Sequence, residues 1–299
     1  MISMNNIFMT YKTGVRALDN VSINVKKGQI AAVIGHNGAG KSTLFKILCG
    51  IIIQYSGESL IDGKTSCIGM SNRISYLPEV RGIDTRKCVI DHLTHLLMYK
   101  GYNKNEAENY ILEGLKQFDM LNVKYEKIGS LSKGNQQKLQ IILAIANNPD
   151  VIILDEPFSG LDLITVDYLW DVIYKLRDKG CTIIFSTHNL FDNITKCDKF
   201  FILKNGHVIE SGNLEEIQEH YNMILEIENE TLSEEGLGGI AGVGKYHKEG
   251  SVFCIEIENQ KVAKTIYDSL KDKYCKRFYV RKFTLAEIFR TIGKGKDSE

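Results

Sequence analysis

The sequence predicts an α/β protein with a parallel core sheet, a helical subdomain inserted in that sheet, and a small C-terminal α+β domain. Two short apolar runs, 151–154 and 181–185, flank a helical stretch at about 164–178, which is the β-α-β pattern of a parallel sheet. Between about 85 and 131, apolar residues recur near the spacing of helices. With 299 residues, 43% of them hydrophobic, the chain is long enough for one large and one small domain.

The first elements in chain order are a strand pair and a helix joined by a glycine-rich loop. Residues 21–25 alternate between apolar and polar side chains, and the run 30–34 is entirely apolar, which indicates an amphipathic strand followed by a buried one. After Lys41, the apolar residues lie on one side of a helix that Gly50 stops. The sequence therefore predicts a strand, a loop and a helix in succession.

The C-terminal part differs in character from the rest. Beyond Leu214 the chain runs through an acidic helix and a glycine-rich stretch into a strand-like segment at 252–258. Thr284 and Glu287 form a capping box, whose side chains satisfy the first free amides of a last helix. We predict a large α/β domain at 1–218, with its helical subdomain at about 84–135, and an accessory α+β domain at 219–299.

Composition excludes several classes of protein. Lys and Arg number 37 and Asp and Glu also 37, so no net charge draws the chain toward nucleic acid or anionic lipid. The seven cysteines are scattered, without a C-x-x-C pair or the close Cys/His spacing of zinc sites, and we interpret them as reduced core thiols. No signal peptide and no long apolar run is present. We therefore expect a cytoplasmic protein without a nucleic-acid partner.

A phosphate-binding loop follows the buried strand at 30–34. The segment 35–43 matches G-x-x-x-x-G-K-[ST], and it opens a helix as such a loop must. Its glycines let successive amides face phosphates, with Lys41 as a point charge and Ser42 offering its hydroxyl to Mg²⁺. A glycine turn with an exposed lysine is the alternative, which the preceding strand disfavours. The residues expected to bind ATP here are Gly35, His36, Asn37, Gly38, Ala39, Gly40, Lys41, Ser42 and Thr43.

Two carboxylates follow the second buried strand, at 151–154. Asp155 and Glu156 are thereby delivered at the carboxyl edge of the sheet, where ligands bind. Asp155 suits Mg²⁺, and Glu156 is the candidate base for the attacking water. A strand-end Asp-Glu pair can also be solvated charge. Because phosphoryl transfer needs both this pair and the phosphate loop, their joint presence favours the catalytic interpretation.

The segment 131–137, Leu-Ser-Lys-Gly-Asn-Gln-Gln, resembles the L-S-G-G-Q signature of the ATP-binding cassette (ABC) family. The resemblance covers roughly residues 1–215 and implies a P-loop NTPase cassette, with an N-terminal antiparallel β subdomain beside the parallel sheet and the helical subdomain. It also implies that the signature closes over ATP bound to the opposite subunit. Read alone, the serine would only cap a helix. The signature residues are Ser132, Lys133, Gly134 and Asn135, of which Lys133 and Asn135 depart from the family pattern.

The resemblance assigns four further roles. Asp162 corresponds to the loop that crosses the dimer interface, and His188 to the switch histidine that contacts the γ-phosphate or the attacking water. Tyr11 corresponds to the aromatic on which adenine stacks, although a strand tyrosine can also serve packing alone. Glu79 stands where the family has a glutamine, and a carboxylate there can ligate Mg²⁺ directly or through water.

The implied function is Mg²⁺-dependent ATP hydrolysis by two paired cassettes, a homodimer or a heterodimer, that power a separately encoded membrane permease. The pattern Pro78-Glu-x-Arg-Gly and the segment 284–289 resemble the export branch of the family. The permease would dock on the cytoplasmic face of the membrane, in a groove beside residues 75–100. The apolar residues that could line this groove, or equally belong to the subdomain core, are Tyr76, Val80, Ile83 and Ile90.

Two other functions remain open at this stage. One is a soluble ABC-type ATPase that works on ribosomes or DNA, although such proteins typically join two cassettes or insert a coiled coil, and only 90 residues separate Lys41 from Leu131. The other is an ATP sensor without useful turnover. Glu156 and His188 argue against a sensor, whereas Lys133 and Glu79 leave it possible.

Overall fold

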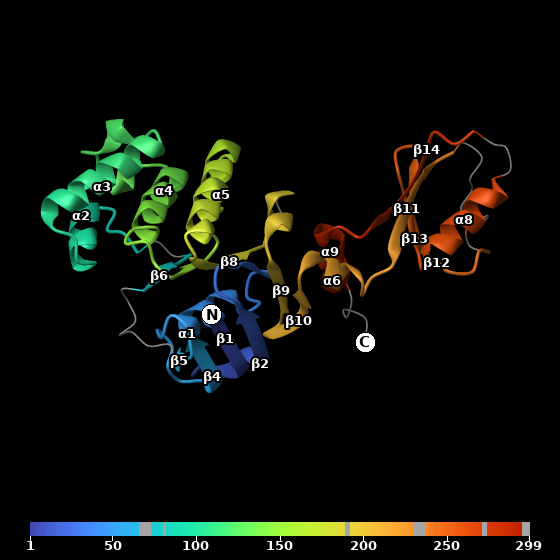
Figure 1. The fold of residues 1–299 in the computed structure, drawn as a ribbon, viewed down its shortest axis with the longest axis horizontal. Coiled ribbons are helices and arrows are strands. Elements are labelled where there is room, and N and C mark those ends of the chain that lie inside the picture. Colours follow the sequence, from blue (N-terminus) through green and yellow to red (C-terminus); the bar gives the residue numbers. More distant parts are fainter. Residues whose placement is uncertain are drawn as a thin grey trace. The chain divides into compact units, whose positions relative to one another are not determined.

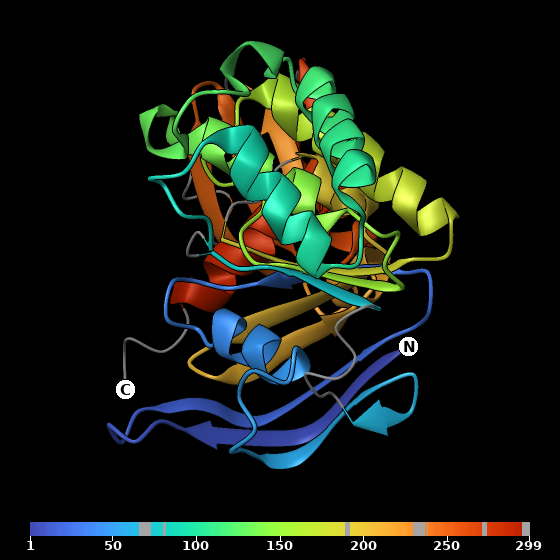
Figure 2. The same ribbon diagram turned by 90° about the vertical axis from the view of Figure 1, so that its left-hand side faces the viewer.

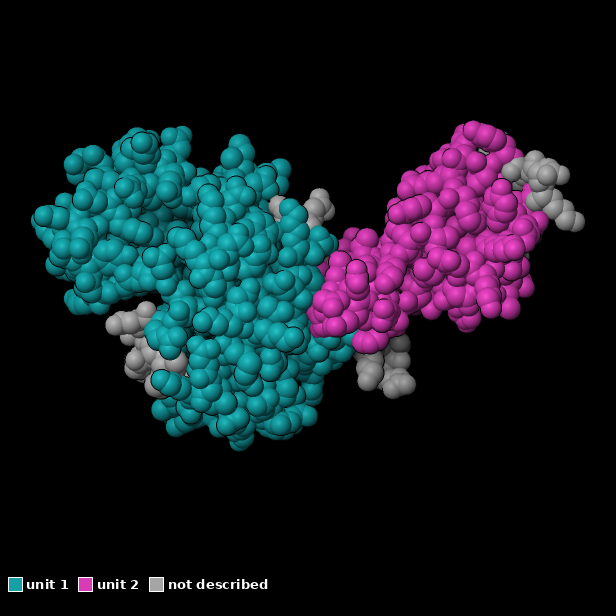
Figure 3. All heavy atoms as spheres, viewed as in Figure 1, with its two compact units in different colours: residues 1–211 teal, residues 212–299 magenta. Residues whose placement is uncertain are grey.

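The computed structural model describes residues 1–65, 73–79, 82–188, 192–229, 237, 239–270 and 274–294. The chain forms two compact units, Met1–Ser211 and Gly212–Glu299, which Figure 3 colours teal and magenta. Each unit has a hydrophobic cluster of its own. In the described residues, no helix combines the length and the apolar character needed to cross a membrane.

The first unit begins with an antiparallel sheet in the order β2-β1-β4-β5. Burial alternates along its second strand, as expected for a sheet with one face against a core. This sheet is the N-terminal antiparallel subdomain that the family resemblance implied. Its strands are β1 (Ile2–Thr10), β2 (Arg16–Val25), β4 (Ser56–Ile61) and β5 (Lys64–Thr65).

A second sheet of six strands follows the order β10-β9-β3-β8-β7-β6. The pairs β3–β8, β3–β9, β6–β7 and β7–β8 are parallel, so the predicted parallel core sheet is confirmed. β3 and β7 are buried along their whole length, because helices or the other sheet cover both of their faces. The strands are β3 (Ile30–Ile34), β6 (Ile74–Leu77), β7 (Val151–Leu154), β8 (Thr182–Thr187), β9 (Lys199–Lys204) and β10 (His207–Gly212).

Apart from α5, which follows β7, the helices of this unit fall into two groups. The first group is α1 alone, whose buried side chains join one cluster with strands of both sheets. The second is the inserted subdomain, where α2, α3 and α4 contact one another and lie together at one side of the parallel sheet (Figures 1 and 2). The helices are α1 (Lys41–Leu48), α2 (Val89–Tyr99), α3 (Lys104–Gln117), α4 (Lys133–Ala144) and α5 (Leu163–Asp178), with 3₁₀ turns η2 (Leu121–Val123), η3 (Ile128–Ser130) and η4 (Asp192–Lys196).

The second unit is built on an antiparallel sheet in the order β12-β13-β11-β14. One face of this sheet packs on α8 around Leu225, Ile255 and Ile266. The opposite face, which we call the polar face, carries His247, Glu249, Cys254, Glu226 and Arg281. The elements are α6 (Leu214–Gln218), β11 (Met223–Glu228), β12 (Val243–Glu249), β13 (Val252–Ile257), α8 (Gln260–Ser269), β14 (Arg277–Lys282) and α9 (Leu285–Lys294).

The sequence anticipated part of this unit. The strand at 252–258 and the capping box of Thr284 and Glu287 are confirmed, since each side chain bonds the other's backbone amide. The acidic helix after Leu214 has only five residues. β11, α8 and β14 were not expected, and the glycine-rich stretch and the chain end lie partly outside the described residues.

Candidate nucleotide site

The phosphate loop is held between β3, α1 and the end of β8. The Gly35 amide donates to the Thr187 carbonyl at 3.2 Å, and the Ala39 amide donates to the His36 carbonyl at 3.1 Å. Gly40 has φ of 107° directly before α1. A Cβ there would lie 2.6 Å from the Ala17 carbonyl oxygen, so a side chain would meet both strain and backbone. The loop backbone can therefore follow this path only with glycine at position 40.

Lys41 is a buried cation inside this loop. Its Nζ donates to the carbonyls of Gly35, at 2.6 Å, and His36, at 3.3 Å. The same Nζ lies 3.3 Å from Oε1 of Glu156, and the two side chains are only 6% and 7% exposed. Charges so far from water interact strongly with whatever faces them. The loop thus concentrates positive charge where phosphate oxygens would bind.

Asp155 and Glu156 follow β7 at the carboxyl edge of the parallel sheet, as predicted. The Asp155 amide donates to the Leu77 carbonyl at 2.8 Å, which joins the turn to β6. Glu156 adopts φ of 52°, in the left-handed region that side chains other than glycine rarely enter. Such strain persists only where neighbours fix it, and it is common at functional sites.

Ser186 fixes the carboxylate of Asp155 and the backbone of Glu156, and sequence reasoning missed it. Its hydroxyl donates to Oδ1 of Asp155 at 2.5 Å and accepts the backbone N–H of Glu156 at 2.9 Å. Ser186 is fully buried on β8, the strand next to β7. A hydroxyl near the end of a fully buried strand, two residues before His188, was the available signal. One side chain therefore orients the metal candidate and the base candidate together.

His188 completes the arrangement around Glu156. Its Nδ1 lies 2.9 Å from Oε2 of Glu156, so the carboxylate sits between Lys41 on one oxygen and His188 on the other. His188 is 38% exposed, whereas Glu156 is nearly buried. The imidazole is therefore the member of the group that solvent reaches.

The metal candidates are a hydroxyl and two carboxylates. Ser42 Oγ donates to Oε2 of exposed Glu79 at 3.5 Å, and Asp155 is held by Ser186 as described. Hydroxyl and carboxylate oxygens are the hard ligands that Mg²⁺ prefers, so the residues fit that ion. Glu79 can reach the site despite replacing the family's glutamine.

Tyr11 lies beside the first turn of α1. Its hydroxyl and Oγ1 of Thr43 are 2.9 Å apart, which brings the ring next to the phosphate loop. The tyrosine is 37% exposed, so part of its ring is open to a ligand. The structure therefore places Tyr11 beside the phosphate loop rather than in a distant part of the sheet.

The signature and the dimer-loop residues form a second group at the starts of α4 and α5. Ser132 caps α4 by accepting the Asn135 amide at 3.2 Å, and Asp162 caps α5 by accepting the Thr165 amide at 2.9 Å. A Cβ on Gly134 would lie 2.7 Å from the Gly160 carbonyl oxygen, so the two loops touch through backbone. Lys133 stands beside them, in the first turn of α4.

One connection joins this second group to the carboxylates. Gln137 of α4 is buried, and its Nε2 donates to the carbonyl of Pro157, directly after Glu156, at 3.3 Å. The hydrogen bond ties the signature helix to the turn that carries the candidate base. A shift of α4 would therefore move Gln137 and, through its hydrogen bond to Pro157, the turn that carries Glu156.

A groove lies between the carboxyl end of β6 and the inserted subdomain. It has a volume of about 200 Å³, and Tyr76 and Ile83 line it as expected, whereas Ile90 does not and Val80 lies outside the described residues. The Tyr76 hydroxyl and the amide of Gln140 are buried without a hydrogen-bond partner among the described residues. The other lining residues are Leu77, Pro78, Gly82, Leu96, Lys100, Leu143 and Ala144.

Comparisons with known proteins agree with this geometry. A family model described as ABC transporter matches residues 18–159. The uncharacterized ABC transporter ATP-binding protein MJ1023 of Methanocaldococcus jannaschii is 44% identical over 68% of this chain and 74% of its own. The lipopolysaccharide export system ATP-binding protein LptB of Escherichia coli is 32% identical over 72% of this chain and 92% of its own. A solved dimer of the ATP-binding cassette MJ0796 with ADP and phosphate has a TM-score of 0.66 at 26% identity, covering 72% of this chain and 99% of that one.

Proposed function

The chain belongs to the ABC transporter family as an ATP-binding subunit, and on this premise we propose that it hydrolyses ATP in a pair of cassettes that drives a separately encoded export permease. Its ATPase class follows from the cassette fold and the family. The partner cassette, the permease, the export direction and the residue roles below are the proposal.

The position of Glu156 carries this proposal. Its two oxygens face Lys41 and His188, and its backbone is fixed by Ser186. In this arrangement Glu156 accepts a proton from the attacking water, Lys41 binds the phosphates, and His188 orients the water or the γ-phosphate. Bound at Ser42, Asp155 and Glu79, Mg²⁺ would neutralise phosphate charge.

Two chains are needed for a complete site. ABC cassettes dimerise, as the MJ0796 cassette does in its solved structure. Ser132 and Gly134 sit at the start of a helix, where free amides favour an anion. We assign Ser132, Lys133, Gly134 and Asn135 to the γ-phosphate of ATP on the partner cassette, with Asp162 at the interface. Lys133 would add a positive charge to that contact.

The groove beside β6 is the proposed seat of the permease. Its walls are mainly apolar, which suits a short amphipathic helix. The buried hydroxyl of Tyr76 and the buried amide of Gln140 are polar atoms that a partner can satisfy. Docking there would place the chain on the cytoplasmic face of the membrane. Closure of the cassettes would then move a segment that is in direct contact with the permease.

We propose export as the direction of transport because a relative of this chain belongs to an export system. LptB is named as part of a lipopolysaccharide export system, and it shares 32% identity over 72% of this chain. The Pro78-Glu79 pair beside the groove resembles the same branch. The proposal extends to the direction of transport and not to lipopolysaccharide as the cargo, because selectivity resides in the membrane subunit.

The test is to trap the closed pair and identify its partner. The Glu156→Gln variant with ATP would be purified from native membranes in mild detergent, beside wild type without nucleotide. Mass spectrometry should identify a polytopic membrane protein in stoichiometric amount. Recovery of ribosomal or DNA-bound partners, or of the cassette alone, would overturn the transporter proposal in favour of a soluble ATPase or a sensor. A permease that imports its cargo in vesicles would overturn only the direction.

A further inference from the structure

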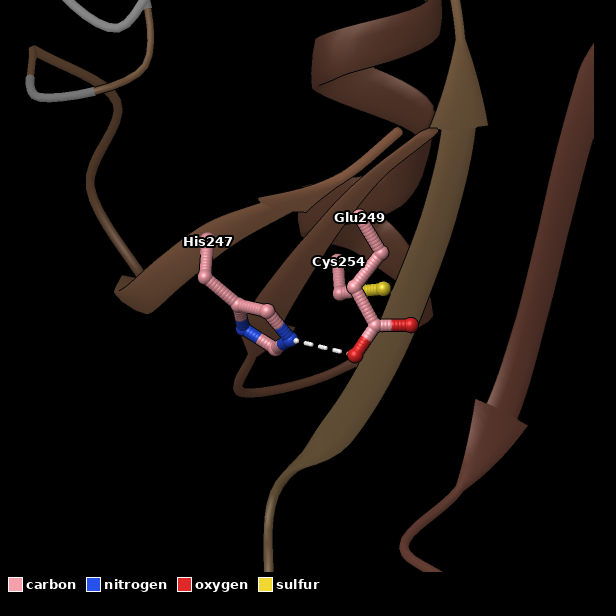
Figure 4. Close-up of side chains that lie close together, drawn as sticks. All are labelled: His247, Glu249 and Cys254. Carbon is pink, nitrogen blue, oxygen red and sulfur yellow. Dashed lines mark hydrogen bonds and ion pairs between the residues drawn. The ribbon is translucent and has the colours of Figure 1, made fainter. Parts of the chain in front are cut away.

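The polar face of the C-terminal sheet brings together three side chains that the nucleotide site does not use. His247 and Cys254 are direct cross-strand partners on β12 and β13, and Glu249 lies two residues beyond His247 on the same strand face. Their donor atoms all lie within 4.8 Å of one another. Figure 4 shows the imidazole, the carboxylate and the thiol side by side on this face.

We propose that His247, Glu249 and Cys254 form a binding site for one zinc-class divalent cation. Imidazole nitrogen, thiolate sulfur and carboxylate oxygen are the donors that Zn²⁺ accepts in proteins. A neutral imidazole, a thiolate and a carboxylate together carry two negative charges, which match a divalent ion. The thiol releases its proton to solvent as its sulfur binds the metal.

The geometry is close to what such an ion requires. Nε2 of His247 and Oε1 of Glu249 are 3.2 Å apart. Tetrahedral bonds of about 2.0–2.3 Å place ligand atoms roughly 3.3–3.7 Å apart, so the cluster needs to contract by only about 1 Å. His247 and Glu249 are 61% and 72% exposed and can rotate to do so. Cys254 is 7% exposed, so its thiol is held in place while the other two side chains rotate toward it.

The backbone determines this grouping. β12 and β13 are joined by a tight turn in which Gly250 has φ of 61°. The register of the pair, Glu249 opposite Val252 and His247 opposite Cys254, therefore follows from the turn. A slip of β12 against β13 by one residue would move every side chain of β12 to the other face of the sheet. The two metal donors on β12 are thus held opposite the thiol.

Neighbouring charges leave the site free to bind a cation. Glu226 lies opposite Cys254 on β11, but Arg277 and Arg281 both pair with it. The guanidiniums are therefore engaged by a carboxylate that is not one of the three donors. The Nζ of Lys248 lies over the ring of Phe253, on the other face of the hairpin. The ion would have three protein ligands and an open fourth position facing water.

The site is unrelated in kind to the magnesium candidates. Ser42, Asp155 and Glu79 offer oxygen alone, whereas this cluster combines nitrogen, sulfur and oxygen. Excess Mg²⁺ should consequently compete poorly, because a hard ion gains little from thiolate and imidazole. The two sites can be distinguished in one protein by this preference.

Cobalt provides the probe, because Co²⁺ bound to a thiolate absorbs by charge transfer from sulfur. The full chain, freed of metal and kept reduced with a phosphine, would be titrated with CoCl₂ in the presence of excess Mg²⁺. We expect a charge-transfer band that saturates at one ion per chain. Removing even an outer-shell partner costs about 10–100-fold in metal affinity, so loss of a ligand should cost roughly 100-fold or more.

Three variants decide the assignment. Cys254→Ala should lose the band, and His247→Gln, on an exposed edge strand, should keep the fold and bind roughly 100-fold more weakly. Cys275→Ala, which removes another cysteine of the same unit, should bind as wild type. Wild type without a band, a band that survives Cys254→Ala, or His247→Gln with wild-type affinity would each overturn the proposal. Far-ultraviolet circular dichroism and thermal unfolding, compared with wild type, check that the variants are folded.

Discussion

The nucleotide site and the polar face of the C-terminal sheet both place a cation beside a carboxylate, but they differ in the exposure of the cation and in the number of cations on the carboxylate. Lys41 and Glu156 are 6% and 7% exposed, and buried Ser186 fixes the backbone of Glu156. On the polar face, Arg277 is 50% exposed and pairs with Glu226, which is only 12% exposed and which Arg281 also binds. The loss of a single buried partner is costly, whereas the second arginine on Glu226 makes the loss of half-exposed Arg277 mild. The comparison separates the groups to which we assign catalysis from groups that only support a fold.

The largest effect is expected for Glu156→Gln, which keeps the size of the side chain and removes the base. General-base catalysis contributes about 10²–10⁴-fold, so kcat should fall at least about 100-fold while ATP binding changes little. Phosphate release and equilibrium nucleotide binding measure the two separately. Glu215→Gln, an exposed carboxylate of α6, should leave both unchanged. Unchanged turnover in Glu156→Gln would mean that another group is the base and that the buried pair is structural.

Ser186→Ala tests whether one hydroxyl supports both the Asp155 carboxylate and the Glu156 backbone. It leaves the Asp155 carboxylate and the Glu156 amide without a buried partner, which should lower the free energy of unfolding of the first unit by about 1–3 kcal/mol. Urea denaturation followed by Trp170, the single tryptophan, reports on this unit. Ser130→Ala, which removes an exposed hydroxyl, should change stability by less than about 0.5 kcal/mol. Equal losses of stability in Ser186→Ala and Ser130→Ala would mean that the buried hydroxyl of Ser186 contributes no more than an exposed one.

Acid should destabilise the polar face, because it protonates Glu287, the α9 carboxylate that Arg281 of this face binds. Burial opposes the charged carboxylate, but hydrogen bonds from Arg281 and Thr284 lower the pKa of Glu287 from 4.5 to about 2. The folded pKa is the lower one, so the stabilisation is complete above about pH 4.5 and is lost as pH falls toward 2. Because the Glu287 carboxylate is partly solvated, we expect it to contribute only about 1 kcal/mol to the free energy of unfolding. Hydrogen-exchange protection in β14 and α9, taken relative to the intrinsic exchange rate at each pH, should fall over this range in wild type and not in Glu287→Gln.

The smallest effect is expected for Arg277→Ala. Glu226 keeps its contact with Arg281, whose Nε donates at 2.6 Å, so no carboxylate is left unpaired. Because Arg277 is half exposed, we expect its pair with Glu226 to contribute about 0.2–1 kcal/mol to the free energy of unfolding. Hydrogen exchange of β11 and β14 measures the difference, with Lys276→Ala as a neighbouring control. A loss as large as that of Ser186→Ala would erase the distinction between the two regions.

Much of the nucleotide site could be predicted because topology converts motifs into contacts. Parallel strands end at one edge of the sheet, so the loop after β3, the carboxylates after β7 and His188 after β8 must converge there. The phosphate loop, Asp155, Glu156 and His188 meet in this way. Ser186 could not be assigned from the chain alone, because its role depends on β8 lying next to β7 rather than on any spacing in the sequence.

The C-terminal unit was harder to predict because its register depends on pairing. Arg277–Lys282 has no regular alternation, since charged residues flank Phe278, Tyr279 and Val280, and it forms a strand by pairing with β11. The cysteine spacing argued against a metal site, since His247 and Cys254 are separated by six residues and match no zinc motif. A hairpin register brings them together, and that register is visible only in the fold.

The left-handed backbone of Glu156 places activity and stability in opposition at one position. A side chain in this region costs about 1–2 kcal/mol, whereas glycine adopts the same conformation freely. Replacing Glu156 by glycine would relieve that backbone cost, but it would leave buried Lys41 without its carboxylate and would remove the proposed base. The strained conformation is therefore kept together with a side chain on which both the buried cation and the proposed turnover depend.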